Sequence, residues 1–175
     1  MIKNIVVLLS MCAIGCSSAE ATDKTDNWRA SINALGPVQI GMSTDALQEY
    51  AGEIERQHGD GEGCIYFSPV NGEKDVSFML FEGRLVRIDV YSRKTETLSG
   101  VRVGDTRDNI MRMYDDAVEE IDEDESHGQM LYLKSSRPEY KNYRMIFDVK
   151  NNIVSDYRLG LLPYVNWQQG CSGER

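Results

Sequence analysis

The chain repeats one short pattern, and this repeat constrains the possible fold more than any other feature of the sequence. Residues 38–47 read Val-Gln-Ile-Gly-Met-Ser-Thr-Asp-Ala-Leu, and residues 101–110 read Val-Arg-Val-Gly-Asp-Thr-Arg-Asp-Asn-Ile. Each copy has an apolar–polar–apolar start, a glycine, and then Ser43 or Thr106 at the position of a helix N-cap. A chain that contains one pattern twice is expected to fold as two copies of one unit.

The residues that follow each N-cap predict a helix and then strands. In each copy, apolar residues recur at helical spacing, a polar stretch follows, and three strand-like runs come next. The runs are 64–67, 76–81 and 85–91 in the first copy and 130–133, 143–149 and 153–159 in the second. Glu82-Gly83 and Asn151-Asn152 are the expected turns between the last two runs of each copy.

The predicted fold class is therefore α+β. We expect two tandem units, each a helix plus an antiparallel three- to four-stranded sheet, packed together. A unit of about 60 residues buries little surface alone, so the two should pack on one another or share a continuous sheet. The first repeat is expected at 31–97, and the second repeat with a C-terminal tail at 98–175.

The N-terminus predicts export and a lipid anchor. After Lys3 an apolar run extends from Ile5 to Ile14, and ten helical residues rise only about 15 Å, half of the roughly 30 Å hydrocarbon core of a membrane. The segment is thus typical of a signal peptide. Its end, Ala13-Ile14-Gly15-Cys16, resembles the lipobox of bacterial lipoproteins. The alternative is an ordinary secretory signal cut near residues 19–21.

The lipobox resemblance has consequences for location. It implies a lipoprotein signal peptide at 1–15, followed at 16–30 by a lipidated cysteine and a flexible tether, with Cys16 carrying a diacylglycerol anchor in a membrane. Ser17, where inner-membrane lipoproteins tend to have Asp, implies the outer membrane, with the folded part facing the periplasm. Of the four cysteines, Cys12 would leave with the signal and Cys16 would carry lipid. Cys64 and Cys171 then remain to form one disulfide in an oxidising compartment.

Charge excludes one class of partner. The chain has 19 Lys and Arg against 28 Asp and Glu, a formal net charge of -9. Nucleic-acid binding needs a surplus of cations to displace counterions, so no nucleic-acid partner is expected. The surplus of acids favours a neutral or basic partner instead.

The repeat also resembles a known family. Gly41-Met42-Ser43, followed by Leu47 and Gly52, resembles the motif of the SmpA/OmlA (BamE-like) small outer-membrane lipoproteins. The second copy keeps Gly104, Thr106 and Ile110 and has Asp115 in place of the last glycine. The same fold in tandem occurs in beta-lactamase-inhibitor-protein-like repeats, which grip an enzyme with a concave sheet. The resemblance implies an adaptor or inhibitor that binds an envelope protein.

Catalytic and metal-binding signals are weak. The sequence has two histidines, His58 and His127, and no nucleophile elbow, P-loop or dinucleotide fingerprint. We therefore predict no enzyme, no catalytic residue and no cofactor. The segment from His58 to Cys64 alternates ligand-type side chains with glycines and is interpreted as a solvated loop, with a transition-metal site as the alternative. The acidic run 115–125 is expected on the exposed face of the second helix and the loop after it, and it lacks an EF-hand's spacing.

Two features are candidates for partner binding. Arg87 and Asp89 are predicted to share the strand face opposite Val86, Ile88 and Val90. That face is either simply solvated or a recognition surface.

The second feature is the tail, where Tyr164 and Trp167 belong to the residue types enriched at interfaces. The alternative for these two residues is packing of the tail near Cys171. We therefore expect an outer-membrane-anchored periplasmic lipoprotein that acts as a non-enzymatic protein-binding adaptor or inhibitor. The alternative function is a periplasmic small-molecule- or metal-binding module.

Overall fold

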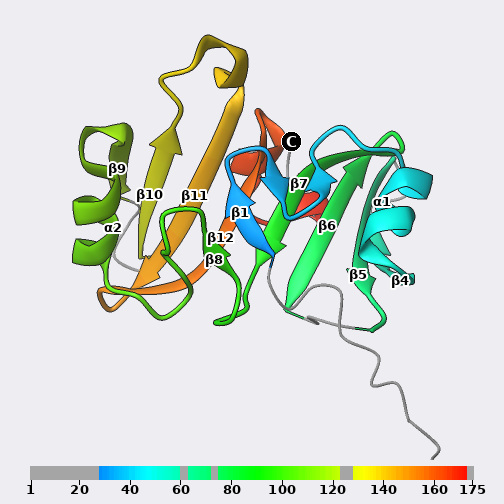
Figure 1. The fold of residues 1–175 in the computed structure, drawn as a ribbon, viewed down its shortest axis with the longest axis horizontal. Helices are drawn as coiled ribbons and strands as arrows, with labels where there is room; N and C mark the ends of the chain where they lie inside the picture. The colour runs from blue at the N-terminus through cyan, green and yellow to red at the C-terminus, as the bar shows by residue number, and fades with distance from the viewer. Residues whose placement is uncertain (1–27, 60–62, 72–74, 123–127, 173–175) are drawn as a thin grey trace, which may run out of the picture.

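The centre of the molecule is an eight-stranded antiparallel sheet with strand order β4-β5-β6-β7-β12-β11-β10-β9 (Figure 1). The computed structural model describes residues 28–59, 63–71, 75–122 and 128–172. The strands of this sheet are β4 (Ile54–Gly59), β5 (Cys64–Pro69), β6 (Val76–Phe81), β7 (Arg84–Val90), β9 (Val118–Asp122), β10 (Gln129–Lys134), β11 (Tyr143–Lys150) and β12 (Ile153–Leu161).

A second, small sheet and two short helices complete the described fold. The small sheet has the order β3-β2-β1-β8, in which only β1 and β8 pair in parallel. Its strands are β1 (Arg29–Ser31), β2 (Ala34–Leu35), β3 (Val38–Gln39) and β8 (Glu96–Thr97). Helices α1 (Thr44–Ala51) and α2 (Arg107–Tyr114) have eight residues each. No helix in the described part of the chain has the length and apolar character needed to cross a membrane.

The predicted fold class is wrong. The described chain is mostly β, and one continuous sheet stands where two packed helix-plus-sheet units were predicted. β7 and β12 join the two halves by antiparallel pairing between Val90↔Tyr157 and Arg87↔Gly160. The separate mixed sheet, which belongs to neither unit, was not predicted.

Two strands come from stretches that the sequence analysis treated as polar connections. β4 and β9 form the two edges of the large sheet. The acidic run therefore begins in a 3₁₀ turn, η1 (Asp115–Ala117), and continues in β9, not on a helix; residues 123–127 lie outside the described part. Charged residues on an edge strand oppose pairing with another chain. Such strands therefore have a polar composition, and the hydrophobic pattern of the sequence does not predict them.

The predicted caps and turns form. The Ser43 hydroxyl accepts a hydrogen bond from the Ala46 amide at 3.3 Å, and the Thr106 hydroxyl accepts one from the Asn109 amide at 3.2 Å. The turns at residues 82–83 and 151–152 have positive φ at both central residues, which is the geometry of tight hairpins. The structured chain also includes residues 28–30, which the sequence analysis placed in the tether; Ala30 is buried in the small sheet.

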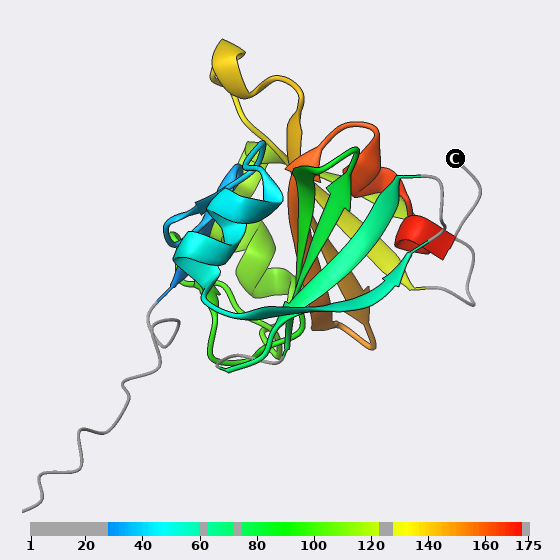
Figure 2. The same ribbon diagram turned by 90° about the vertical axis from the view of Figure 1, so that its right-hand side faces the viewer.

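The two faces of the large sheet are covered differently. Figure 2 shows both helices and the small sheet on one side, called here the inner face, and the C-terminal tail on the other, the outer face. The tail is defined as residues 162–172 and contains two 3₁₀ turns, η3 (Tyr164–Asn166) and η4 (Gly170–Ser172). The main hydrophobic core lies on the inner face and contains the fully buried Phe78, Phe147 and Tyr157.

Candidate functional site

Charged side chains gather on the outer face at the middle of the sheet. Successive side chains of a strand point to opposite faces, and the strand register then decides which side chains are neighbours. In the strand register, Asp89 on β7 lies opposite Arg158 on β12, and Asp156 on β12 lies opposite Asp148 on β11. Three adjacent strands therefore bring these groups together beneath the tail.

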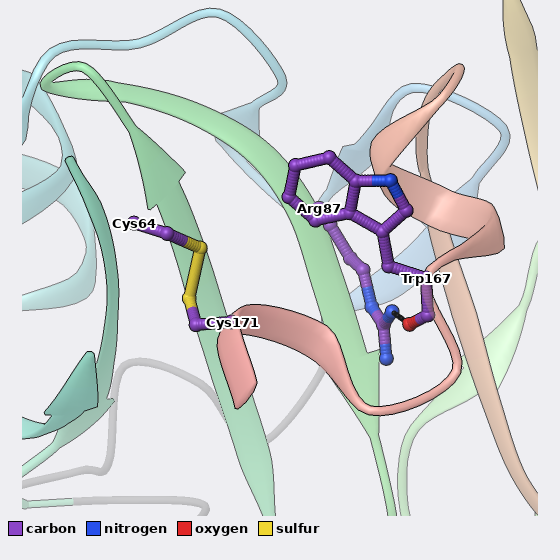
Figure 3. The surroundings of a disulfide bond; sticks show 4 residues. All are labelled: Cys64, Arg87, Trp167 and Cys171. Atoms are coloured by element: carbon purple, nitrogen blue, oxygen red, sulfur yellow. Dashed lines mark hydrogen bonds between the residues drawn. A yellow bond between two sulfur atoms is a disulfide. The ribbon is translucent and has the colours of Figure 1, made fainter. Parts of the chain in front are cut away.

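Arg87 connects this cluster to the tail. Arg87 and Asp89 are only 4% and 3% exposed. The Arg87 Nε donates a hydrogen bond to Asp89 Oδ1 at 2.8 Å, and Nη2 pairs with the same oxygen. Its Nη1 donates to the backbone carbonyl of Trp167, as Figure 3 shows. The guanidinium thus neutralises a buried carboxylate and fixes the tail at the same time.

Arg158 makes a second connection of the same kind. It is 4% exposed, and its Nε donates a hydrogen bond to the Val165 carbonyl at 2.8 Å. Its Nη1 pairs with Asp148 Oδ2, and its Nη2 lies 3.3 Å from the Met130 sulfur. Each of the two buried arginines therefore binds one carboxylate on the sheet and one carbonyl of the tail.

A disulfide and aromatic contacts hold the tail at its two ends. Cys64 on β5 and Cys171 are joined by a disulfide, with their Cα atoms 5.5 Å apart. Tyr164 and Trp167 pack on Phe81, with ring centroids 5.1 and 6.0 Å from its ring. The structure thus gives Tyr164 and Trp167 the packing role that the sequence analysis kept as the alternative to partner contact.

The outer face beneath the tail also contains Val86, which the sequence analysis placed on the opposite face. Met79 pairs with Arg87, whereas its neighbour Leu80 pairs with Leu85, so Val86 is an extra residue in the ladder. This bulge turns Val86 toward the cluster around the disulfide. Strict alternation holds along residues 87–90 only.

An open polar recess of about 320 Å³ lies between the outer face and the tail. Its lining residues come from β7 and the position after it, from β10, β11 and β12, and from the tail. They are Arg87, Tyr91, Met130, Asp148, Lys150, Asp156, Arg158, Gln168 and Gln169. The recess is thus a mixed-charge site built mostly from sheet residues and closed on one side by the tail.

Asp148 is the most perturbed acid in this recess. Burial raises its pKa from 3.8 to about 7, and the neighbouring Asp156 carboxylate adds to that rise, while Arg158 and Arg87 act in the opposite direction. Tyr91, which is 49% exposed, has its pKa raised to about 12 by burial and by Asp89. Near neutral pH the Asp148 carboxyl therefore retains its proton during part of the time.

The cluster has one buried polar atom without a partner. Asp89 Oδ2 accepts no hydrogen bond from any residue that the structure describes. Burial, and then the Asp89 carboxylate, raise the pKa of the adjacent Tyr66 phenol. The Asp89 charge is still paired with Arg87, so what this oxygen lacks is a hydrogen bond, and it carries the free-energy cost of its desolvation.

A second and larger recess lies at the other end of the sheet. It has a volume of about 650 Å³ and is lined by parts of η1, β9, β10 and the β1–β2 turn, among them Ile32, Val118 and Leu133. The ion pair at its edge, Glu119 with Lys134, is about half exposed on both sides. This recess contains none of the site residues predicted from the sequence and no buried charge.

The structure places the remaining sequence candidates as follows. Cys16 lies outside the described residues, as do Asp60 and Glu62 of the glycine-rich segment. The His58 ring stacks on Tyr66 with centroids 4.8 Å apart, and Cys64 is in the disulfide. Within residues 28–59, 63–71, 75–122 and 128–172, no group of three or more His, Cys, Asp or Glu is placed to hold a metal ion.

Sequence reasoning singled out Arg87 and Asp89 and missed Asp148, Asp156 and Arg158. One signal was available, because Asp156 and Arg158 alternate with apolar residues as Arg87 and Asp89 do. What the sequence does not show is that the two charged strands are neighbours and that the tail covers them.

Comparisons with known proteins identify no family and no function for the chain. No family model and no curated protein matches the chain. The uncharacterized protein YfeY from Escherichia coli is similar in structure, with a TM-score of 0.49 and 13% identity over 75% of this chain and 99% of that chain. An extracellular protein containing an SCP domain from Bacillus anthracis has a TM-score of 0.45 and 11% identity over 68% of this chain and 43% of that chain. No functional argument rests on similarities of this size.

Proposed function

We propose that the protein is a non-enzymatic lipoprotein of the cell envelope whose folded body binds a small polar ligand in the recess beneath the tail. The observation that supports this most is the Asp148–Asp156 carboxyl pair, which lies on the neighbouring strands β11 and β12 beside open volume that the tail borders. Ligand sites are typically concave, about 300–1,000 Å³ in volume, and contain a few convergent polar groups. The volume of the recess, about 320 Å³, lies at the lower end of that range, and its polar groups come from several elements.

The burial of the predicted contact residues favours a ligand over a protein partner. Arg87 and Asp89 are buried beneath the protein's own tail, so a protein docking on the outer face would first meet the tail. A partner that gripped the sheet itself would have to displace the disulfide-linked segment and both arginine contacts. A small molecule needs only the recess as it stands.

The recess hypothesis is tested by ligand screening on the chain produced without residues 1–15 and with Cys16→Ser, which removes the signal segment and the lipid. We expect small polar probes to shift the amide NMR signals of residues around Asp148 and Asp156. Asp156→Asn should reduce these shifts. Glu55→Gln, on the exposed edge strand β4, is the matched control and should leave them unchanged. Shifts that are spread evenly over the surface, or that survive Asp156→Asn in full, would count against a site in the recess.

The proposed location rests on the sequence around Cys16. A diacylated and then N-acylated cysteine inserts several chains, which makes attachment far stronger than that of a single chain. Mass spectrometry of the mature protein should find Cys16 as the acylated N-terminal residue in the outer-membrane fraction. A chain that begins at residues 19–21 without lipid would support the ordinary secretory signal instead.

A further inference from the structure

We propose that the recess takes a small ligand with a primary ammonium group, which Asp148 and Asp156 bind and Tyr91 flanks. This inference rests on the proposed function, since it assigns a chemical class to the ligand of the same site. The charges of the outer face, the groups left unpaired there and the residues that line the recess support it.

The positive charges deep in the site are already used. Arg87 pairs with Asp89 and the Trp167 carbonyl. Arg158 pairs with Asp148 and the Val165 carbonyl. An anionic ligand would have to compete with these internal partners for each guanidinium, and winning that competition would loosen the tail. The buried arginines therefore act as supports for the site and are poor anion receptors.

The lining of the recess contains three cations and two carboxylates, but one of these carboxylates, Asp156, has no ion pair among the described residues. Asp89, Asp148 and Asp156 face two buried guanidiniums, so one carboxylate has no buried cation of its own. Asp156 accepts a hydrogen bond from the Ser155 hydroxyl at 2.9 Å, which supplies no charge. A cation entering the recess would give Asp156 an ion pair.

The lining fits a monovalent organic cation better than a metal ion. Calcium takes six to eight oxygen ligands in a close shell, and no group of three or more His, Cys, Asp or Glu among the described residues is placed to hold a metal ion. An ammonium needs only about three acceptors, which two carboxylates and the side-chain amide oxygen of Gln169 can supply. The Tyr91 ring, 49% exposed in the lining, offers a face for a cation–π contact.

Lys150 limits what else the ligand can be. It is exposed at the end of β11 and lines the recess, and no ion pair in the described residues engages it. Its charge disfavours a ligand with a second cation close to the first. It tolerates a ligand whose other end is neutral or negative, and we therefore expect monoamines to bind better than short diamines.

Binding should release a proton. The groups that face Asp148 are Asp156 and Arg158 on β12, Arg87 and Tyr91 from β7 and the position after it, and Lys150 on its own strand. The Asp148 carboxyl is part-protonated near neutral pH because burial and Asp156 raise its pKa to about 7. An ammonium beside the pair favours the charged carboxylate. Affinity for an amine should therefore rise as the pH increases from about 6 to 8 while the amine, with a pKa near 10, stays charged.

The experiment is calorimetric titration of the same Cys16→Ser chain with three probes that share a three-carbon skeleton: n-propylamine, propionate and propionamide. We expect propylamine to bind most tightly, and the heat at pH 7 to depend on the ionisation enthalpy of the buffer, which reports proton release. Asp156→Asn should weaken propylamine binding about ten- to hundredfold, as expected for a lost charged hydrogen bond. Tyr91→Leu, at an exposed position, should weaken it about two- to fivefold.

Glu55→Gln is the control and should bind all three probes as the parent does. Tighter binding of propionate or propionamide than of propylamine would overturn the ligand class and leave the proposed function standing. If none of the three probes binds or shifts a recess signal, both proposals fail. Equal propylamine affinity in the parent, in Asp156→Asn and in Tyr91→Leu would show that the amine binds elsewhere and would also overturn the inference.

Discussion

At the scale of the residue, the outer face shows what a local pattern can and cannot predict. Alternation along residues 87–90 correctly put Arg87 and Asp89 on one face. Their burial was not predictable from the same pattern, because the carbonyl that covers Arg87 belongs to Trp167, 80 residues away. The bulge at Val86 was not predictable for a similar reason, because it depends on the register in which β7 pairs with β6.

The Arg87–Asp89 pair gives a test of the buried charges. Arg87→Met should lower the free energy of unfolding by about 3–5 kcal/mol, because it leaves Asp89 buried and charged without its partner. The double variant Arg87→Met/Asp89→Leu should lose less, since no unpaired charge remains. Chemical denaturation measures both. A double variant less stable than Arg87→Met would contradict this account of the pair.

Asp148 predicts a pH dependence with a definite sign. Its pKa is raised from 3.8 to about 7 in the folded protein, so between those values the folded state binds more protons than the unfolded state. Its contribution to stability is therefore full below pH 4 and is lost as the pH rises through about 7. Asp148→Asn should remove this component, so the stability difference between parent and variant should change with pH across that window. A difference that stays constant from pH 4 to 8 would exclude the shift.

At the scale of the element, capping and turn signals were reliable and composition was not. Ser43 and Thr106 cap the two helices, and both predicted turns form, because each depends on a few adjacent residues. Strands β4 and β9 were missed, since they lie at the edges of the sheet and have polar side chains. The parallel pairing of β1 with β8 joins residues 29–30 to residues 96–97, which no local signal could predict.

The tail is the element that makes the recess, and the disulfide is its strongest restraint. The double variant Cys64→Ser/Cys171→Ser should lower the free energy of unfolding by about 2–5 kcal/mol under oxidising conditions. Hydrogen exchange should become faster first at the tail amides that follow Trp167. The parent treated with reductant is the matched comparison and should behave in the same way. Unchanged stability in both would mean that the disulfide does not restrain the tail.

At the scale of the whole molecule, the repeat in the sequence corresponds to two halves of one sheet. The element order α1-β4-β5-β6-β7 is followed along the chain by β8 and then α2-β9-β10-β11-β12. The sequence analysis considered two arrangements, packing of the two copies on one another and one shared sheet. It predicted packed units, and this prediction is wrong. The deciding contact is the pairing of β7 with β12. Charged side chains alternate with apolar ones along both strands at that junction, and this alternation is typical of a strand with one solvated face and not of a central strand covered on both faces.

Gly160 makes this junction possible and tests it. A Cβ at position 160 would lie 2.4 Å from the Val86 carbonyl oxygen and 2.9 Å from the Arg87 Cα on the neighbouring strand. Gly160→Ala should therefore lower the free energy of unfolding by about 1–3 kcal/mol, the usual range for overpacking. Gly100→Ala is a useful comparison, because a Cβ there meets nothing within 4 Å and only the positive φ of 85° is strained. If Gly160→Ala is as stable as the parent, the close approach of the two strands is not real.

The central claim is that Asp148 and Asp156 on the outer face bind an ammonium ligand, and that this ligand displaces the proton from the Asp148 carboxyl. The most direct measurement is a pH titration of the Asp148 side-chain carboxyl carbon by NMR, with and without propylamine. The account predicts a midpoint near pH 7 for the free protein and a lower midpoint with the amine present. A midpoint near the ordinary value of 3.8 in the free protein, or one that propylamine leaves unchanged, would contradict it.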